Sequence, residues 1–110
     1  MSKASPSLPY GTLDLLVLRT VAGGPLHGYG ILLQIHAASS HLLRIEEGSL
    51  YPALHRLETM GLLKAEWAMS ENKRRAKYYS LTGRGRRQLA EEERNWEQVA
   101  EGVSRVLRFA

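Results

Sequence analysis

The stretch EEGSLYPALHRLETMGLL, which runs from Glu46 to Leu63, decides the fold because its apolar residues recur at helical spacing. We predict a helix from about Gly48 to Met60. Gly61 then supplies the residue that tolerates the left-handed turn at a helix end. One face of this helix is apolar and should be buried, and it carries Leu50, Leu54 and Leu57.

The start of this helix suits a surface that meets phosphate. With Ser49 as the cap, Pro52 lies in the first turn, where its missing N–H costs nothing because those donors have no partner within the helix. Hydroxyl groups beside bare backbone N–H groups can press against a phosphate. Tyr51 either joins this contact or only shapes the helix start. Farther along, three side chains share the outer face and can reach base edges: His55, Arg56 and Thr59.

Two shorter helices precede it. Thr12 is placed to cap the first, whose buried stripe contains Leu13, Leu16, Val17 and Val21, and a Gly-Gly-Pro run at 23–25 ends it. The second is predicted from about His27 to Ser39, with inner positions Tyr29, Leu32, Ile35 and Ala38. His27 is interpreted as a local cap or packing residue. Residues 1–9 are rich in serine and proline, which predicts a flexible arm.

After Gly61 the apolar period changes from helical to alternating. Apolar and polar residues alternate from Leu63 to Met69, a polar turn ENKRR follows at 71–75, and a second run extends from Ala76 to Leu81. This pattern predicts a β-hairpin with a basic tip. The segment from Glu71 to Arg87 contains seven basic residues and one acidic residue, so its net charge is +6 in a chain whose total is +4.

A long helix closes the chain. Thr82 is its predicted cap and Val106 its approximate end, and the apolar residues Leu89, Trp96 and Val103 fall seven apart. This stripe has no evident partner in so small a chain, so we expect it to pack against a second copy. The predicted subunit interface comprises Leu13, Leu16, Val17, Leu89, Trp96, Val99, Val103 and Val106. Trp96 is interpreted mainly as interface packing, with stacking on a flat aromatic effector as the alternative.

These elements predict a mainly α protein with a small β-hairpin, a winged helix-turn-helix followed by a dimerisation helix. The DNA-binding domain is expected at 1–81 and the dimerisation helix at 82–110. In this architecture the third helix enters the major groove, and the wing reaches the adjacent backbone or minor groove. The chain has no cysteine and no apolar run of about 20 residues, so we expect a cytoplasmic protein without a membrane partner.

Three segments resemble the PadR family of bacterial transcriptional regulators: LHGYGI at 26–31, GSLYPALHRLETMGLL at 48–63 and YYSLTGRGRRQL at 78–89. The resemblance implies a homodimeric repressor that binds double-stranded DNA at an operator. By position it places DNA contacts at Ser49, Leu50 and Tyr51, and on the wing at Lys73, Arg74, Arg75 and Lys77. The single long helix resembles the short subfamily, whose members can bind flat hydrophobic compounds between subunits. A small hydrophobic or aromatic effector at Trp96 is thus a further expectation.

Enzyme and metal functions find little support in the residues. The chain lacks a cysteine nucleophile, a GxSxG elbow and a P-loop, and no cofactor is expected. His27, His36 and His41 do not share one helix face, so no metal site is predicted. Two alternatives remain open: a winged helix that docks its basic wing on an acidic protein, and a sequence-blind nucleic-acid binder.

Overall fold

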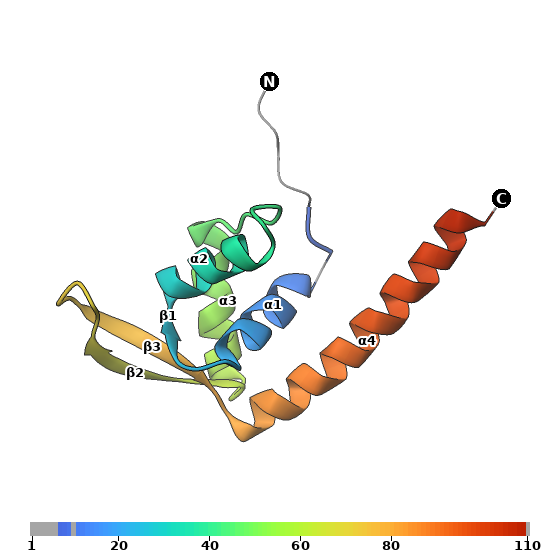
Figure 1. Ribbon diagram of the computed structural model, residues 1–110. Helices are drawn as coiled ribbons and strands as arrows, with labels where there is room; N and C mark the ends of the chain where they lie inside the picture. Colours follow the sequence, from blue (N-terminus) through green and yellow to red (C-terminus); the bar gives the residue numbers. More distant parts are fainter. Residues whose placement is uncertain (1–6, 10, 110) are drawn as a thin grey trace.

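The computed structural model describes residues 7–9 and 11–109, and it confirms the predicted fold class (Figure 1). Most of the flexible arm predicted for 1–9 lies outside the described residues. The element order is α1 (Thr12–Val21), β1 (Leu26–His27), α2 (Gly28–Ala38), α3 (Glu47–Thr59), β2 (Leu63–Met69), β3 (Arg75–Leu81) and α4 (Gly83–Arg108).

The wing hairpin belongs to a three-stranded antiparallel sheet in the order β1-β3-β2. Strands β2 and β3 form the predicted hairpin, in register from Leu63 opposite Leu81 to Met69 opposite Arg75. The sequence-based prediction missed β1, whose two residues pair with Tyr78 and Tyr79 of β3. Two residues are too short to show an alternating pattern, and only the distant β3 makes them a strand.

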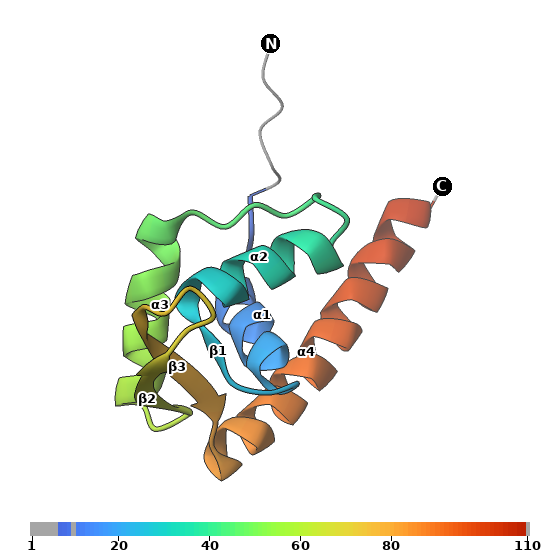
Figure 2. The same ribbon diagram turned by 60° about the vertical axis from the view of Figure 1, so that its left-hand side comes forward.

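Helices α1, α2 and α3 pack together over the base of this sheet (Figure 2). The core includes Val17, Leu18, Ile31, Leu50, Leu54, Leu57 and Leu63, each no more than 2% exposed. In α2 the inner residues are Ile31 and Ile35, whereas Tyr29 is 53% exposed and Ala38 is exposed, so the predicted inner face was wrong at those two positions. Tyr29 lies two residues from Ile31, which puts it on the opposite side of the helix.

Helix α3 begins earlier than predicted. Glu46 occupies the cap position, and its carbonyl accepts from the N–H groups of Ser49 and Leu50 at 3.0 and 2.9 Å. Ser49 is therefore not the cap, and Pro52 lies in the second turn instead of the first. Pro52 has no N–H to donate to the Gly48 carbonyl four residues earlier. Both residues are exposed, so water can donate to that carbonyl instead.

Thr12 is likewise not a cap, because Gly11 holds that position with φ of 87° and the Thr12 N–H bonds to the Pro9 carbonyl at 3.0 Å. The other predicted caps are confirmed. The Gly30 N–H donates to His27 Nδ1 at 3.0 Å, and the Gly85 N–H donates to the Thr82 hydroxyl at 2.9 Å.

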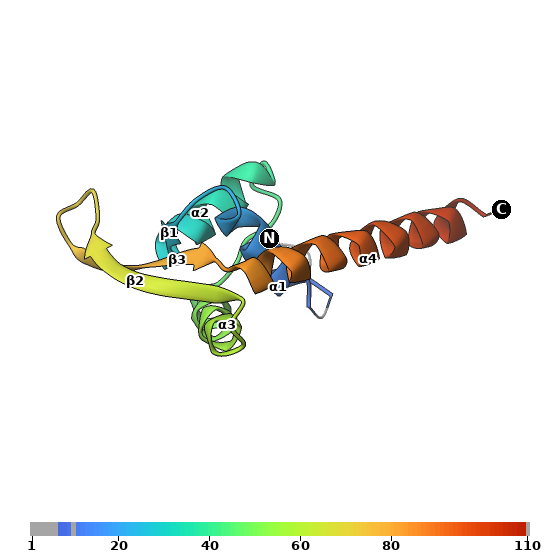
Figure 3. The ribbon, with the colours of Figure 1, turned by 90° about the horizontal axis from the view of Figure 1, so that it is seen from below.

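Helix α4 packs on the body through its N-terminal half, which contacts α1 and includes an ion pair of 3.6 Å between Glu93 and Arg19. Gly85 lies against the backbone of Leu62, and Leu89 is 6% exposed in the core. The C-terminal half of α4 extends away from the body, on the side opposite the wing (Figure 3). Val17 is fully buried, and Leu89 nearly so, within their own chain, which corrects their assignment to a subunit interface. The domain boundary at 81/82 stays a prediction.

Replacing Gly85 with Ala should lower the free energy of unfolding by about 3 kcal/mol, because overpacking against backbone cannot be relieved by a rotamer change. A Cβ at this position would lie 2.1 Å from the Leu62 carbonyl oxygen. Urea denaturation followed by circular dichroism measures the effect. Gly48→Ala is the control, since a Cβ there meets no atom within 4 Å. A Gly85→Ala protein as stable as the wild type would show that the docking of α4 is misplaced.

Candidate nucleic-acid interface

The outer face of α3 is the first component of the interface. The buried residues Leu50, Ala53, Leu54 and Leu57 define its inner side. At 3.6 residues per turn, the side opposite them carries Gly48, Pro52, His55 and Thr59, all of them exposed. His55 and Thr59 thus occupy the position predicted for base readers. Leu50 is 0% exposed, so its proposed DNA contact is wrong and its role is in the core.

Ser49 and Arg56 lie on the flank of α3 that faces α1. The Arg56 guanidinium forms an ion pair with the carboxylate of Asp14 in α1. Its side chain is 52% exposed, while that of Asp14 is 22% exposed. The Arg56 side chain therefore runs along the protein surface towards α1 and does not point straight outward. Sequence spacing could not indicate Asp14 as its partner.

Tyr51 lies on the opposite flank of α3 and packs on the start of α2. Its ring approaches Gly28 so closely that a Cβ on Gly28 would stand 2.6 Å from a ring carbon. Burial raises the pKa of the Tyr51 phenol, and the Glu47 carboxylate and Tyr79 raise it further. The phenol therefore stays protonated at neutral pH and can donate a hydrogen bond to an anion.

The wing tip is a tight turn at residues 70–74. The N–H of Ser70 bonds to the Arg74 carbonyl at 2.7 Å, and the N–H of Lys73 bonds to the Ser70 carbonyl at 2.9 Å. Lys73 has φ of 58°, a left-handed conformation within the turn. Lys73 and Arg74 are exposed there, and Arg75 opens β3 with its guanidinium 4.9 Å from the centre of the Trp67 ring. Three cations thus cluster at the end of the hairpin.

Lys77 connects the wing to α3. Its ammonium group lies 3.1 Å from the Glu58 carboxylate, and both side chains are about one-third exposed. The hydrogen bond that Lys77 donates to the Glu58 carboxylate raises the pKa of Lys77 above its ordinary value, against a smaller opposing effect of burial. The pair links β3 to α3, and DNA contact by Lys77 stays a prediction.

A groove of about 600 Å³ lies between the start of α2, Tyr51 and the wing. Its lining combines cations with aromatic rings: Tyr29, Tyr51, Trp67, Tyr79, Arg74, Arg75 and Lys77. Hydroxyl and cationic groups of this kind contact phosphate in protein–DNA complexes. Sequence reasoning missed Tyr29 and Trp67 as parts of this surface, because Tyr29 was predicted to face inward and Trp67 was considered only as an apolar residue of an alternating strand.

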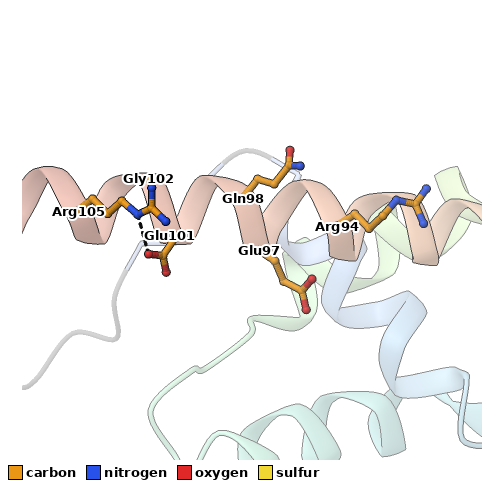
Figure 4. A pocket seen from close by; sticks show the side chains of 6 residues that line it. All are labelled: Arg94, Glu97, Gln98, Glu101, Gly102 and Arg105. Carbon is orange, nitrogen blue, oxygen red and sulfur yellow. Dashed lines mark hydrogen bonds and ion pairs between the residues drawn. The ribbon is translucent and has the colours of Figure 1, made fainter.

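Helix α4 presents two different faces beyond its anchored turns. One is apolar and exposed: Trp96, Val99, Val103, Val106 and Leu107 are between 43% and 79% exposed. The opposite face is polar and holds a shallow hollow of about 410 Å³, in which Arg105 donates to Glu101 at 2.9 Å (Figure 4). All residues of that hollow belong to α4 itself. The apolar face is therefore the candidate surface for contact with a partner.

The model of the PadR-like transcriptional regulator family matches residues 17–91. The chain belongs to this family. It is 36% identical over 89 residues to a transcriptional regulator of Mycobacterium tuberculosis, covering 81% of this chain and 79% of that protein. A solved PadR-family structure from Eggerthella lenta is 37% identical, with a TM-score of 0.76, and the match covers 91% of this chain and 85% of the Eggerthella chain. A regulator from Clostridium thermocellum is 29% identical, with a TM-score of 0.78 and coverage of 86% and 92%.

Membership in the PadR family confirms the predicted resemblance and makes the protein a DNA-binding regulator and not an enzyme. Among residues 7–9 and 11–109, no group of three or more His, Asp or Glu side chains could hold a metal ion. His36 and His41 contact each other, with ring nitrogens 3.2 Å apart, but they form only a pair. No helix in the described part of the chain is long and apolar enough to cross a membrane.

Proposed function

We propose that this PadR-family protein is a sequence-specific repressor that acts in the cytoplasm as a homodimer on an inverted-repeat operator. One observation carries the proposal: an exposed outer face on α3 and a basic wing accompany an exposed apolar strip on α4. The first two features suit DNA, and the third suits a second copy of the chain.

In this proposal, α3 is the recognition helix: it lies in the major groove, with His55 and Thr59 towards the base edges. Tyr51 and the wing cations Lys73, Arg74 and Arg75 contact the sugar-phosphate backbone beside it. A winged helix that inserts one helix and one hairpin in this way reads a short half-site. The Lys77–Glu58 pair links the wing to α3, and we propose that this link helps both elements to engage one half-site together.

The apolar strip of α4 is proposed as the centre of the dimer interface, with Trp96, Val99, Val103 and Val106 at its core. Leu13 and Leu16 of α1 are half-buried. Because α1 packs against α4, we propose them as the margin of this interface. A two-fold dimer presents two recognition helices. The operator should then be an inverted repeat whose half-site centres lie about 10 bp apart or at a multiple of that spacing.

Selection from random double-stranded DNA with the purified protein tests this function. The expected product is an enriched motif with dyad symmetry that competes for binding against bulk DNA. An enriched motif without dyad symmetry would contradict the two-fold arrangement. A failure to enrich any motif would contradict sequence-specific regulation.

An effector site beside Trp96 is the finer part of the proposal. A hollow of about 330 Å³ lies between α1 and α4 and is lined by Gly11, Thr12, Asp14, Leu15, Glu92, Asn95 and Trp96. The indole is 43% exposed and can stack on a flat molecule. To relieve repression tenfold, the effector must favour the dimer that cannot bind DNA by about 1.4 kcal/mol. The competing role for Trp96 is plain packing between subunits.

Titration of planar aromatic dyes, both cationic and neutral, should quench tryptophan fluorescence in a Trp67→Phe variant, where Trp96 is the only reporter. Saturable quenching at micromolar dye, absent when Trp96 is the residue replaced, supports the effector site. No quenching across the panel, together with a Trp96→Ala protein that dissociates into monomers, would assign Trp96 to subunit packing alone.

A further inference from the structure

Arg56 occupies a different position on α3 from the two base-facing residues. At 3.6 residues per turn it lies about 70° around the helix from the centre of the outer face, on the same flank as Ser49. The major groove is about 12 Å wide and a helix with its side chains about 10–12 Å across. When such a helix fills the groove, its centre faces base edges and its flanks face the sugar-phosphate walls. Arg56 is therefore placed for a phosphate.

The space in front of Arg56 is a hollow between α1, the loop before α3 and the first turns of α3. Its volume is about 320 Å³, and Arg44, Ser49 and Arg56 contribute two cations and a hydroxyl to its lining. The acids Asp14 and Glu46 line it as well. Two guanidinium groups and a hydroxyl suit a phosphate group, which guanidinium binds in the same forked geometry as a carboxylate.

Asp14 holds the guanidinium that such a phosphate would need. The ion pair joins residues 42 positions apart in the chain, and it links α1 to the outer part of α3. The Asp14 side chain is the less exposed of the two, so the carboxylate is fixed on α1 while the guanidinium remains accessible to solvent. Because exposed ion pairs are weak, a DNA phosphate can exchange with the carboxylate.

We propose that Arg56 is a backbone-phosphate anchor that Asp14 holds in the absence of DNA, and that a phosphate entering the hollow of Arg44, Ser49 and Arg56 displaces the carboxylate. The proposal rests on the DNA-binding function proposed above and assigns Arg56 a role other than base reading. Asp14 is a positioning residue in it: the carboxylate keeps the guanidinium at the hollow and competes with DNA for it. Loss of this competitor should therefore tighten binding to every sequence.

The test is a double-mutant cycle on Asp14 and Arg56. Binding of the selected operator duplex and of a scrambled duplex is measured by fluorescence anisotropy between 50 and 300 mM salt, conditions chosen to resolve the salt slope. Arg56→Ala should weaken binding to both duplexes about fivefold at 0.15 M salt and lower the slope by about 0.9, the value for one lost phosphate contact. Arg56→Lys, which keeps a cation, should retain the slope.

Asp14→Asn should tighten binding to both duplexes by about two- to fivefold, the range expected when an exposed ion pair no longer competes. In the Arg56→Ala background the same change should have no effect. Glu91→Gln on α4 is the control, because it removes one negative charge at an exposed position remote from α3. It should reproduce none of this change. Thermal unfolding of each variant confirms that the fold is intact.

The outcomes separate the two proposals. If the wild type binds neither duplex, the DNA-binding function fails and the phosphate anchor fails with it. If the wild type prefers its operator and Arg56→Ala loses that preference at single base pairs with an unchanged slope, Arg56 reads bases and the anchor is overturned. If Asp14→Asn has the same effect with and without Arg56, Asp14 does not act through Arg56, which also overturns it.

Discussion

Replacing Val103 with Glu should convert the dimer to monomers at micromolar concentration. Val103 is 51% exposed in the single chain and lies at the centre of the apolar strip of α4, between Val99 and Val106. A carboxylate buried there without a partner should cost about 3–5 kcal/mol. That penalty raises the dimer dissociation constant by a factor of roughly 100 to 4,000. Operator affinity should fall with it, because a monomer presents one recognition helix instead of two.

Sedimentation equilibrium over a range of concentrations measures this dissociation constant. Gln98→Glu provides the matched control, since it adds the same charge to the polar face of α4 (Figure 4) and should leave the constant unchanged. A wild-type protein that is monomeric at micromolar concentration would contradict the proposed interface. So would a Val103→Glu protein that dimerises as tightly as the wild type.

Replacing Lys73, Arg74 and Arg75 together with Ala should weaken DNA binding about a hundredfold at 0.15 M salt. Each phosphate contact contributes about 0.9 to the salt slope, so the loss of three should lower it by about 2.7. The loss should be similar for operator and scrambled duplexes, because phosphate contacts carry no sequence information. The triple change also removes the Arg75 guanidinium from the face of Trp67, which affects the wing alone.

A charge-matched control separates wing contacts from overall charge. Replacing Arg94, Arg105 and Arg108 of α4 with Ala removes the same three positive charges from the C-terminal helix. This variant should keep the salt slope within a few tenths of the wild-type value. If the wing variant keeps the wild-type slope, the wing does not contact the backbone. If both variants lower it equally, only net charge matters.

Local signals in the sequence predicted most of the architecture. The Thr82 cap, the strand from Leu63 to Met69 and the turn at Gly61, which has φ of 78°, each depend on residues close together in the chain. Such signals survive folding because the groups that satisfy them are neighbours. The exact starts of α1 and α3 were missed, since each helix begins before the residue with the best capping side chain, by one residue in α1 and by three in α3.

Contacts through space were beyond the reach of sequence patterns. Strand β1 exists only because β3 pairs with it. The partners of Arg56 and Lys77 are acids 42 and 19 residues away in the chain. The sequence contains many basic residues, so it does not indicate which of them pairs with a given acid. Val17 and Leu50 were each predicted to lie on a buried helix face and also to join a surface contact, a subunit interface for Val17 and DNA for Leu50, and their complete burial leaves only the core role. Surface and core can be told apart at such positions only once the helices are packed.

Sequence-specific DNA binding is tested by measuring the affinity for a selected operator and for a scrambled duplex of equal composition across a salt series. We expect the operator to bind at least about 1,000-fold more tightly than the scrambled duplex at physiological salt, and both affinities to fall steeply as salt rises. Equal affinities with a steep salt slope would show a sequence-blind nucleic-acid binder. Weak binding of both duplexes with no salt slope would contradict a DNA reader altogether and indicate a protein-interaction module.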